Sequence, residues 1–412
     1  MDAVKFDVAA GTVQGGCDPR FRLVADEFVR NFQERNEVGA SVCLTYQGET
    51  VVDLWGGIAR PADNTPWERD TVCVVFSCTK GATAICAHIL AARGLLDIEA
   101  PVAGYWPEFA QGAKAGVTVR MMLDHSAGVP ALRENLRPDG VHDWDYMVGR
   151  LEAEEPWWKP GTRNGYHLLT FGWTVGELVR RVSGKSLGTF FQDEVARPLG
   201  IDFWIGAPES TGDRIAPSLD LFARQPDDPL DDFQTAMASD PASLQGRAFL
   251  GEGGFNPNSR ASHAAEIGAA GGISNGRGLA GMYAPFACGG SLGAVTLVDA
   301  DTLTRMGQVS VATNEDATLL LPMRFAPGFM KSIDNRRRPR GTRDSAILSA
   351  AAFGHVGMGG NIGFADPQEA LSLGYAMNRA GQGLLNDRGQ SLVDAAYRSL
   401  GYTSNAGGVW TR

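Results

Sequence analysis

Strand-like runs lie near both ends of this chain, and a long stretch with helical patterns separates them. Near the N-terminus, two β-rich runs at 40–46 and 50–55 flank a turn at Gln47-Gly48-Glu49, which is a hairpin signal. Near the C-terminus, Gly, Pro and Asp separate three short runs, AAFGHVGMGG, NIGFADP and LSLGYAMNR, which are typical of strands. The simplest arrangement is one antiparallel sheet built from both chain ends, with a helical domain inserted between them.

Helical periodicity predicts the elements that accompany this sheet. Phe21, Val24, Phe28 and Phe32 recur at steps of three and four residues, so one face of a helix over 18–35 is apolar. A final helix is expected at about 389–400. We therefore predict an α/β protein of the α+β type, with an antiparallel β-sheet flanked by helices.

The change in pattern along the chain predicts where the two domains divide. Residues 1–76 and 266–412 would form the sheet domain, and 77–265 the mainly helical domain. Within the latter, the segment 206–265 is rich in Asp, Pro, Gly and Ser and is predicted to be a loop that lines a site.

Composition and charge indicate which kinds of binding partner the protein can have. The chain has 412 residues, of which 44% are hydrophobic, and a net charge of −10, so nucleic acid is a poor partner. The basic run at 336–340 is most simply a solvated loop. The sequence has no stretch of 18 uninterrupted apolar residues, so no membrane span is predicted. The first residues do not resemble a signal peptide, and a cytoplasmic location is therefore expected.

Cysteine and histidine usage gives no sign of a metal or a cofactor. The six cysteines contain no C-x-x-C pair, and in a reducing compartment they are expected to be small buried hydrophobes. The six histidines are scattered, with no cluster at metal-ligand spacing. We predict neither a cofactor nor a metal site. The sequence leaves the oligomeric state open.

The segment VFSCTKGATA carries a Ser-x-x-Lys pattern, Ser77 and Lys80, at the start of an apolar helix that Gly94 would end. Residues three apart lie on one helix face, and a lysine in apolar surroundings can lose its charge and act as a base. The helix start also directs backbone N–H groups at the serine. An N-cap serine followed by a snorkelling lysine would give the same pattern.

Two further segments contain residues suited to the same chemistry. Tyr166 follows a Pro-Gly turn in PGTRNGYHLLTFGW, and beside a lysine its phenol could relay protons with a lowered pKa, although a half-buried core tyrosine is the simpler interpretation. The run Gly354–Gly360 contains enough glycine for a ligand or another backbone to approach closely, or it forms a bent strand.

Two matches to G-x-S-x-G, at Ser274 and Ser291, are expected to be misleading. The nucleophile elbow that this pattern describes needs an apolar strand before it and a helix after it. Ser274 follows AAEIGAAGG and Ser291 follows a helical pattern, so neither has that context.

Taken together, the segments resemble the serine β-lactamase and penicillin-binding-protein superfamily, most closely the class C β-lactamase-like family VIII carboxylesterases. Ser77-Cys78-Thr79-Lys80 matches the S-x-x-K motif, and Leu123–Gly128 resembles L-x-H-[ST]-[SA]-G. The segment from Pro160 to Tyr166 and the later GHVGMGG match the second and third motif regions in order and rough spacing. The resemblance implies a β-lactamase/transpeptidase-like fold with its active site between the two domains.

The resemblance also implies roles for single residues. Ser77 would form an acyl-enzyme, with Lys80 and Tyr166 sharing the work of the base. The backbone N–H groups of Ser77 and Met358 would form the oxyanion hole. The substrate-binding residues implied are His355, Gly357, His125 and Trp158.

Two departures from the β-lactamase pattern favour a small-molecule ester as the substrate. Leu168 takes the place of an asparagine that binds the substrate amide, and His355 that of a lysine that helps to bind the β-lactam carboxylate. Esters with short-chain or aromatic acyl groups are expected, because Trp157, Trp158, Phe203 and Trp204 could shape the pockets. The alternatives are a β-lactamase, a D-amino-acid peptidase or amidase, an acyltransferase, and a non-catalytic descendant that binds ligands.

Overall fold

The computed structural model describes residues 1–221, 230–249, 253–339 and 343–412. Within them, an 11-stranded antiparallel sheet runs in the order β1-β2-β4-β3-β17-β16-β15-β14-β13-β12, with β5 paired to β4. Its strands are β1 (Asp2–Val8), β2 (Gly11–Cys17), β3 (Gly39–Tyr46), β4 (Glu49–Arg60), β5 (Thr65–Pro66), β12 (Val311–Thr313), β13 (Met323–Ala326), β14 (Phe329–Met330), β15 (Phe353–Gly357), β16 (Asn361–Asp366) and β17 (Leu371–Met377).

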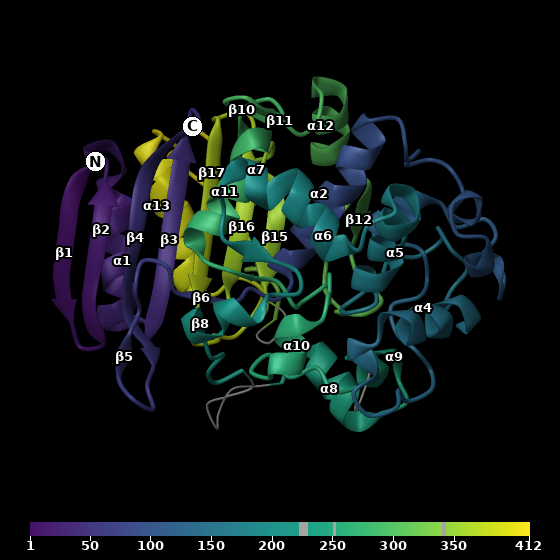
Figure 1. Ribbon diagram of the computed structural model, residues 1–412. Helices are drawn as coiled ribbons and strands as arrows, with labels where there is room; N and C mark the ends of the chain where they lie inside the picture. The colour runs from purple at the N-terminus through teal and green to yellow at the C-terminus, as the bar shows by residue number, and fades with distance from the viewer. Residues whose placement is uncertain (222–229, 250–252, 340–342) are drawn as a thin grey trace.

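The sheet is built from both ends of the chain, as the sequence predicts. Figure 1 shows the purple N-terminal strands beside the yellow C-terminal ones, with the teal middle of the chain on the other side of the molecule. The predicted hairpin is β3–β4, and β3 pairs on its other edge with β17, in a register that sets Tyr46 opposite Leu371. The three predicted C-terminal strands are β15, β16 and β17, so these predictions are confirmed.

Helices cover both faces of the sheet, because successive side chains of its central strands point to opposite faces and are buried on both. In β17, Leu371, Leu373 and Tyr375 contribute to the core beneath α1 (Arg22–Glu34) and α13 (Asp387–Ser399). The residues between them face α11 (Gly276–Ala287): the Ser372 hydroxyl donates to the Ala280 carbonyl at 2.8 Å. Both predicted terminal helices are therefore present, as α1 and α13.

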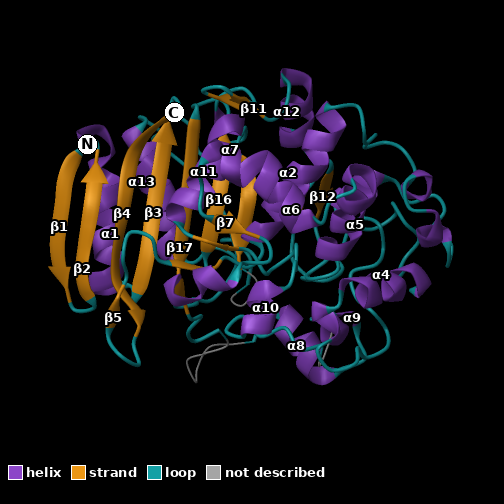
Figure 2. Cartoon of the chain, viewed as in Figure 1, coloured by secondary structure: helices purple, strands orange, loops and turns teal. Residues whose placement is uncertain are grey.

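The remaining elements form the other half of the molecule (Figure 2). Its short strands are β6 (Val72–Val74), β7 (Phe203–Trp204), β8 (Ile215–Ala216), β9 (Ile273–Ser274), β10 (Ser291–Leu292) and β11 (Val295–Thr296). Its helices are α2 (Cys78–Ala92), α3 (Val119–Leu123), α4 (Trp144–Ala153), α5 (Phe171–Ser183), α6 (Leu187–Phe191), α7 (Arg197–Leu199), α8 (Asp232–Ser239), α9 (Leu244–Arg247), α10 (Arg260–Ala264) and α12 (Ala300–Gly307).

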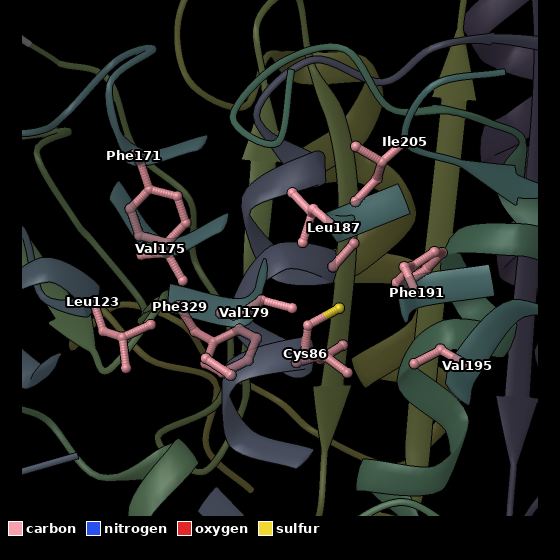
Figure 3. Packing of buried hydrophobic residues seen from close by; sticks show 14 of the residues in the cluster. Cys86, Leu123, Phe171, Val175, Val179, Leu187, Phe191, Val195, Ile205 and Phe329 are labelled. Atoms are coloured by element: carbon pink, nitrogen blue, oxygen red, sulfur yellow. The ribbon is translucent and has the colours of Figure 1, made fainter. Parts of the chain in front are cut away.

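Helix α2 is the centre of this half. Every residue from Cys78 to Leu90 is buried, which agrees with its nearly uninterrupted apolar sequence. Figure 3 shows Cys86 of α2 among side chains from the surrounding elements, including Val179 of α5 and Phe329 of β14. A helix enclosed in this way holds whatever stands at its N-terminus in a fixed position.

One element was not predicted, and one expectation needs correction. The first 17 residues form the hairpin β1–β2, which the sequence analysis did not predict. The side chains of Val4 and Val13 on this hairpin are buried. The segment 206–265 is not all loop, because α8, α9 and α10 lie within it. Part of that segment (222–229 and 250–252), like Arg340 of the basic run, lies outside the described residues.

No helix in the described part of the chain combines the length and the apolar character that crossing a membrane would require.

Candidate active site

Ser77 stands at the turn between strand β6 and helix α2. The Val75 N–H donates to the Gly272 carbonyl at 2.9 Å, which fixes the end of the strand. Phe76 then adopts a left-handed φ of 46°, a costly conformation for a bulky residue that is often found at functional sites. As a result Ser77, the N-cap of α2, is partly exposed, while Phe76 and Cys78 on either side are buried.

Lys80 lies one turn further into the helix and is fully buried. Its Nζ lies 3.2 Å from Ser77 Oγ, and it donates to the Leu168 carbonyl at 2.7 Å and to the Ala269 carbonyl at 3.0 Å. Burial penalises the charged amine and lowers the pKa of Lys80 well below its ordinary value, and no carboxylate among the described residues opposes this shift. A neutral amine keeps two N–H donors for the two carbonyls, which can only accept, and its lone pair then faces the Ser77 hydroxyl.

Tyr166 packs beside both residues. Lys80 Nζ lies 4.7 Å from the centre of its ring. Burial raises the pKa of Tyr166, and a hydrogen bond with Ser77 opposes that change only in part. The expectation that Lys80 would lower the pKa of this phenol is therefore wrong, because burial of the phenol outweighs the contacts that favour the phenolate.

His355 of β15 completes the group from the sheet side. Its Nδ1 lies 2.7 Å from the Val356 carbonyl, and its Nε2 lies 3.4 Å from Tyr166 Oη. Burial lowers the pKa of His355 to about 3, so the ring is neutral at pH 7. Because the carbonyl can only accept, Nδ1 carries the proton, and Nε2 accepts from the Tyr166 hydroxyl.

Two of the other residues implied by the resemblance lie around Tyr166. His125 is only 1% exposed and packs its ring 4.8 Å from that of Tyr166. In this position its ring supports that of Tyr166. Trp158 is half-buried, and a side chain at Gly165 would meet its indole at 2.5 Å, so Trp158 lies next to the backbone that leads to Tyr166.

The other pocket residues expected from the sequence are placed unequally. Phe203 is fully buried in the core against Phe191, with ring centres 5.0 Å apart, so it does not line an open pocket. Trp157 and Trp204 are half-buried, each beneath an arginine side chain.

The glycine-rich strand β15 approaches the serine segment closely. A Cβ at Gly357 would overlap the Val75 carbonyl, two residues before Ser77, so only glycine allows the two backbones to lie together. Met358 follows directly. No described residue accepts a hydrogen bond from the backbone N–H of Ser77 or of Met358, so both donors are free for a ligand.

The two G-x-S-x-G serines lie outside this site, and each has a hydrogen-bond partner. The Ser274 hydroxyl is buried and donates to the Asp202 carbonyl at 2.7 Å. Ser291 lies in the small β10–β11 hairpin and hydrogen-bonds the Thr296 hydroxyl at 3.0 Å. Neither has a basic partner among the described residues. Ser274 does lie in β9 directly before α11, so the expectation that it lacks a strand before it and a helix after it is wrong.

Three groups around the site were missed by the sequence analysis. The Leu168 and Ala269 carbonyls hold Lys80, and a backbone oxygen leaves no signal in a sequence. The buried carboxylate of Asp316 accepts from the Tyr166 N–H at 2.9 Å, across 150 residues of chain. No group of three or more potential metal ligands occurs among the described residues.

Known proteins match both the sequence and this architecture. The beta-lactamase family matches residues 25–397. The esterase/beta-lactamase LipL of Mycobacterium tuberculosis is 34% identical over 383 residues, which cover 90% of this chain and 84% of LipL. The esterase EstB of Burkholderia gladioli is 28% identical over 218 residues, 49% of this chain and 53% of EstB.

Solved structures agree. A family VIII carboxylesterase superposes with a TM-score of 0.81 at 38% identity, over 94% of this chain and 99% of that one. A penicillin-binding-protein homologue from Caulobacter crescentus gives a TM-score of 0.82 at 32% identity, again over 94% and 99%. With the family matched over most of its length, and structural relatives that include a family VIII carboxylesterase, this chain belongs to the beta-lactamase family.

Proposed function

We propose that this protein is a serine esterase that cleaves carboxylic esters with short-chain or aromatic acyl groups through an acyl-enzyme on Ser77. The observation that carries the proposal is the 3.2 Å contact between Ser77 Oγ and the Nζ of a fully buried lysine whose other two partners are carbonyls. The resemblance to LipL, EstB and a family VIII carboxylesterase supports the same reaction class.

Acylation begins when the lone pair of Lys80 takes the Ser77 proton as Ser77 Oγ bonds to the ester carbon. The oxyanion that forms accepts from the N–H groups of Ser77 and Met358. When the C–O bond of the ester breaks, the departing alcohol takes the proton from Lys80. Water then repeats the sequence: its proton goes to Lys80, its oxygen bonds to the acyl carbon, and Ser77 leaves and regains a proton.

Tyr166 shares this work as a neutral phenol. Because its pKa is raised, it stays protonated in the free enzyme and can act only as a relay: its oxygen accepts the Ser77 proton while its own proton leaves for the departing alcohol, which is an alternative to the route through Lys80. His355 accepts from the Tyr166 hydroxyl and so orients it.

The substitutions at two family positions favour esters over β-lactams. Leu168 offers no side-chain amide to bind the substrate amide, and its carbonyl is already engaged by Lys80. His355 is neutral, so it provides no cation for a β-lactam carboxylate. An ester needs neither contact.

Covalent labelling tests the proposal. Wild type, Ser77→Ala and Ser291→Ala are treated with an alkyl fluorophosphonate or a short-chain p-nitrophenyl ester, and their intact masses are measured. We expect an adduct on wild type and Ser291→Ala and none on Ser77→Ala. An adduct that persists in Ser77→Ala would assign the reaction to another residue.

A β-lactamase activity is the second candidate, because the relative LipL is named for both activities. Hydrolysis of a chromogenic cephalosporin by the same three proteins measures it. We expect a rate far below that of ester hydrolysis, because the lysine position of the third motif holds the neutral His355.

A further inference from the structure

The turn that follows β15 carries Met358, Gly359 and Gly360 into β16. Gly359 and Gly360 have left-handed φ values of 87° and 111°, which glycine adopts without strain. Two consecutive glycines give a turn little stiffness of its own. The turn has a hydrogen bond of its own, from the Gly360 N–H to the Gly357 carbonyl at 3.0 Å, and contacts from outside must supply the remaining restraint on the direction of the Met358 N–H.

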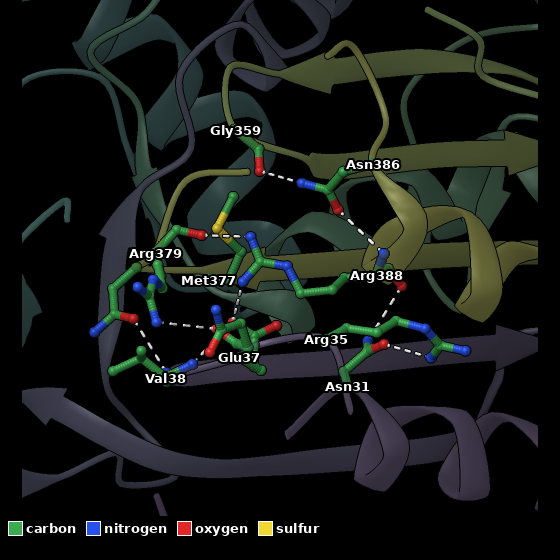
Figure 4. Close-up of polar contacts among 12 residues, drawn as sticks. Asn31, Arg35, Glu37, Val38, Gly359, Met377, Arg379, Asn386 and Arg388 are labelled. Atoms are coloured by element: carbon green, nitrogen blue, oxygen red, sulfur yellow. Dashed lines mark hydrogen bonds and ion pairs between the residues drawn. The ribbon is translucent and has the colours of Figure 1, made fainter. Parts of the chain in front are cut away.

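Asn386 holds it through the Gly359 carbonyl. Its Nδ2 donates to that carbonyl at 2.6 Å, and the Gly381 N–H donates to the same oxygen at 2.9 Å. Figure 4 shows Asn386 reaching across to Gly359 from the start of α13. A Cβ at Gly360 or at Gly381 would overlap the Asn386 amide, so the amide occupies a slot that only glycine leaves open.

The other end of the same amide is fixed to a helix. Asn386 is the N-cap of α13, and its Oδ1 accepts from the N–H groups of Arg388 at 3.2 Å and Gly389 at 3.4 Å. One side chain thus connects a helix terminus to the turn that carries the oxyanion donor.

The start of α13 is itself anchored in the protein interior. Arg388 forms an ion pair of 2.8 Å with Glu37, whose side chain is fully buried, and its Nη2 donates to the Arg379 carbonyl at 2.7 Å. The hydroxyl of Tyr375 in β17 also donates to Glu37. A buried charge pair of this kind fixes geometry because either partner alone would be costly.

We propose that Asn386 is a positioning residue of the esterase reaction, which aims the Met358 N–H at the oxyanion by holding the Gly359 carbonyl. This inference rests on the function proposed for Ser77. Removing the Nδ2 donor would leave the Gly359 carbonyl held by the Gly381 N–H, so the turn could relax in part and the alignment of one oxyanion donor would weaken. Loss of such a donor costs roughly 10²–10³ in kcat, and a partial loss of alignment is expected to cost about 10-fold or more.

Two substitutions separate this role from helix capping. Both Asn386→Asp and Asn386→Ser keep an oxygen that can cap α13, and neither keeps an amide donor for the Gly359 carbonyl. The measurements are kcat and KM for a short-chain p-nitrophenyl ester, with kcat referred to the fraction of protein that a fluorophosphonate labels, together with the thermal midpoint. We expect kcat to fall about 10-fold or more in both variants, with KM and the midpoint close to those of wild type.

The pH dependence supplies a signature that a structural role would not give. A protonated carboxyl can donate to the Gly359 carbonyl, whereas a serine hydroxyl is too short to reach it. The activity of Asn386→Asp relative to wild type should therefore rise as the pH is lowered, and that of Asn386→Ser should stay constant.

Unchanged kcat per labelled site in both variants would overturn the inference, and so would a loss of labelled protein with a lower midpoint but normal kcat. Failure of wild type to be labelled at Ser77 would instead overturn the proposed function, so the two failures are distinguishable.

Discussion

The charge state of Lys80 decides what Ser77 can do. Burial lowers the pKa of this amine and so favours its neutral form, in which the two carbonyls receive its N–H groups and its lone pair is left for the serine. The same burial has an energetic cost, because the unfolded chain can protonate Lys80 at neutral pH and the folded chain resists it. Residues that take part in catalysis commonly lower the stability of the folded protein in this way.

Lys80→Met tests both consequences. Methionine has a similar length and no base, so we expect kcat to fall about 10²–10⁴-fold. The folded pKa of Lys80 is lowered, so the unfolded state binds more protons between that pKa and 10.5, and the stability of wild type rises with pH in that window. Chemical denaturation of both proteins at pH 7 and pH 9.5 measures this: the free energy of unfolding of wild type should gain relative to Lys80→Met at the higher pH. A constant difference would show that Lys80 is charged in the folded protein.

At the scale of elements, the site depends on how closely β15 approaches the turn before α2. Gly357 lies against the Val75 carbonyl with no room for a side chain. The strand and the helix start must therefore keep a fixed separation for Ser77 and Met358 to face one ligand.

Gly357→Ala should disrupt that approach. The added Cβ would force β15 away from Val75, so we expect kcat to fall at least 10-fold as the two N–H donors move apart. Gly149→Ala is the matched control, because nothing lies within 4 Å of a Cβ there and alanine favours helix α4 by up to about 1 kcal/mol. Kinetics and thermal denaturation of both variants check this. If Gly357→Ala kept the kcat of wild type, close approach at this position would not matter for catalysis.

The sequence predicted these elements well wherever side-chain pattern determined them. The β3–β4 hairpin follows from alternating β-formers around Gln47-Gly48-Glu49, and α2 from an apolar run with Ser77 at its start. The hairpin β1–β2 was missed because GTVQGGC, the sequence of β2, is rich in glycine and has no clear strand pattern. In the structure, β2 is held in place by its pairing with β4. Contacts made by carbonyls, such as that of Ala269 with Lys80, carry no residue signal at all.

Motif matching located residues more reliably than it assigned their roles. The motif singled out His125, and its left-handed backbone and its burial place its ring against that of Tyr166, a contact that the motif alone does not predict. Asn386 belongs to no motif, and its link to Gly359 exists only once α13 has packed against the sheet.

At the scale of the whole molecule, the reactive centre and the outer edge of the sheet are separate. β1 and β2 occupy one end of the strand order, and β2 pairs with β4, while Ser77 and β15 lie beyond the middle. The edge strands therefore contribute to stability without touching the reacting groups.

A chain lacking residues 2–17 tests that separation. It loses the burial of Val4, Val13 and Cys17, so its thermal midpoint should fall by several degrees. Its kcat per labelled Ser77 should stay within about twofold of wild type. A large fall in kcat per labelled site would mean that the edge of the sheet is coupled to the reactive centre.

The pairing of β3 with β17 also sets the order of events during synthesis. Thr45 and Ser372 share a hydrogen bond of 2.7 Å and are 327 residues apart. At about 5–20 residues per second, the ribosome releases β3 roughly 15–65 s before its partner strand exists. For that interval the β3 edge of the β3–β4 hairpin has no β17 to pair with, and an unpaired edge can pair with any other extended chain.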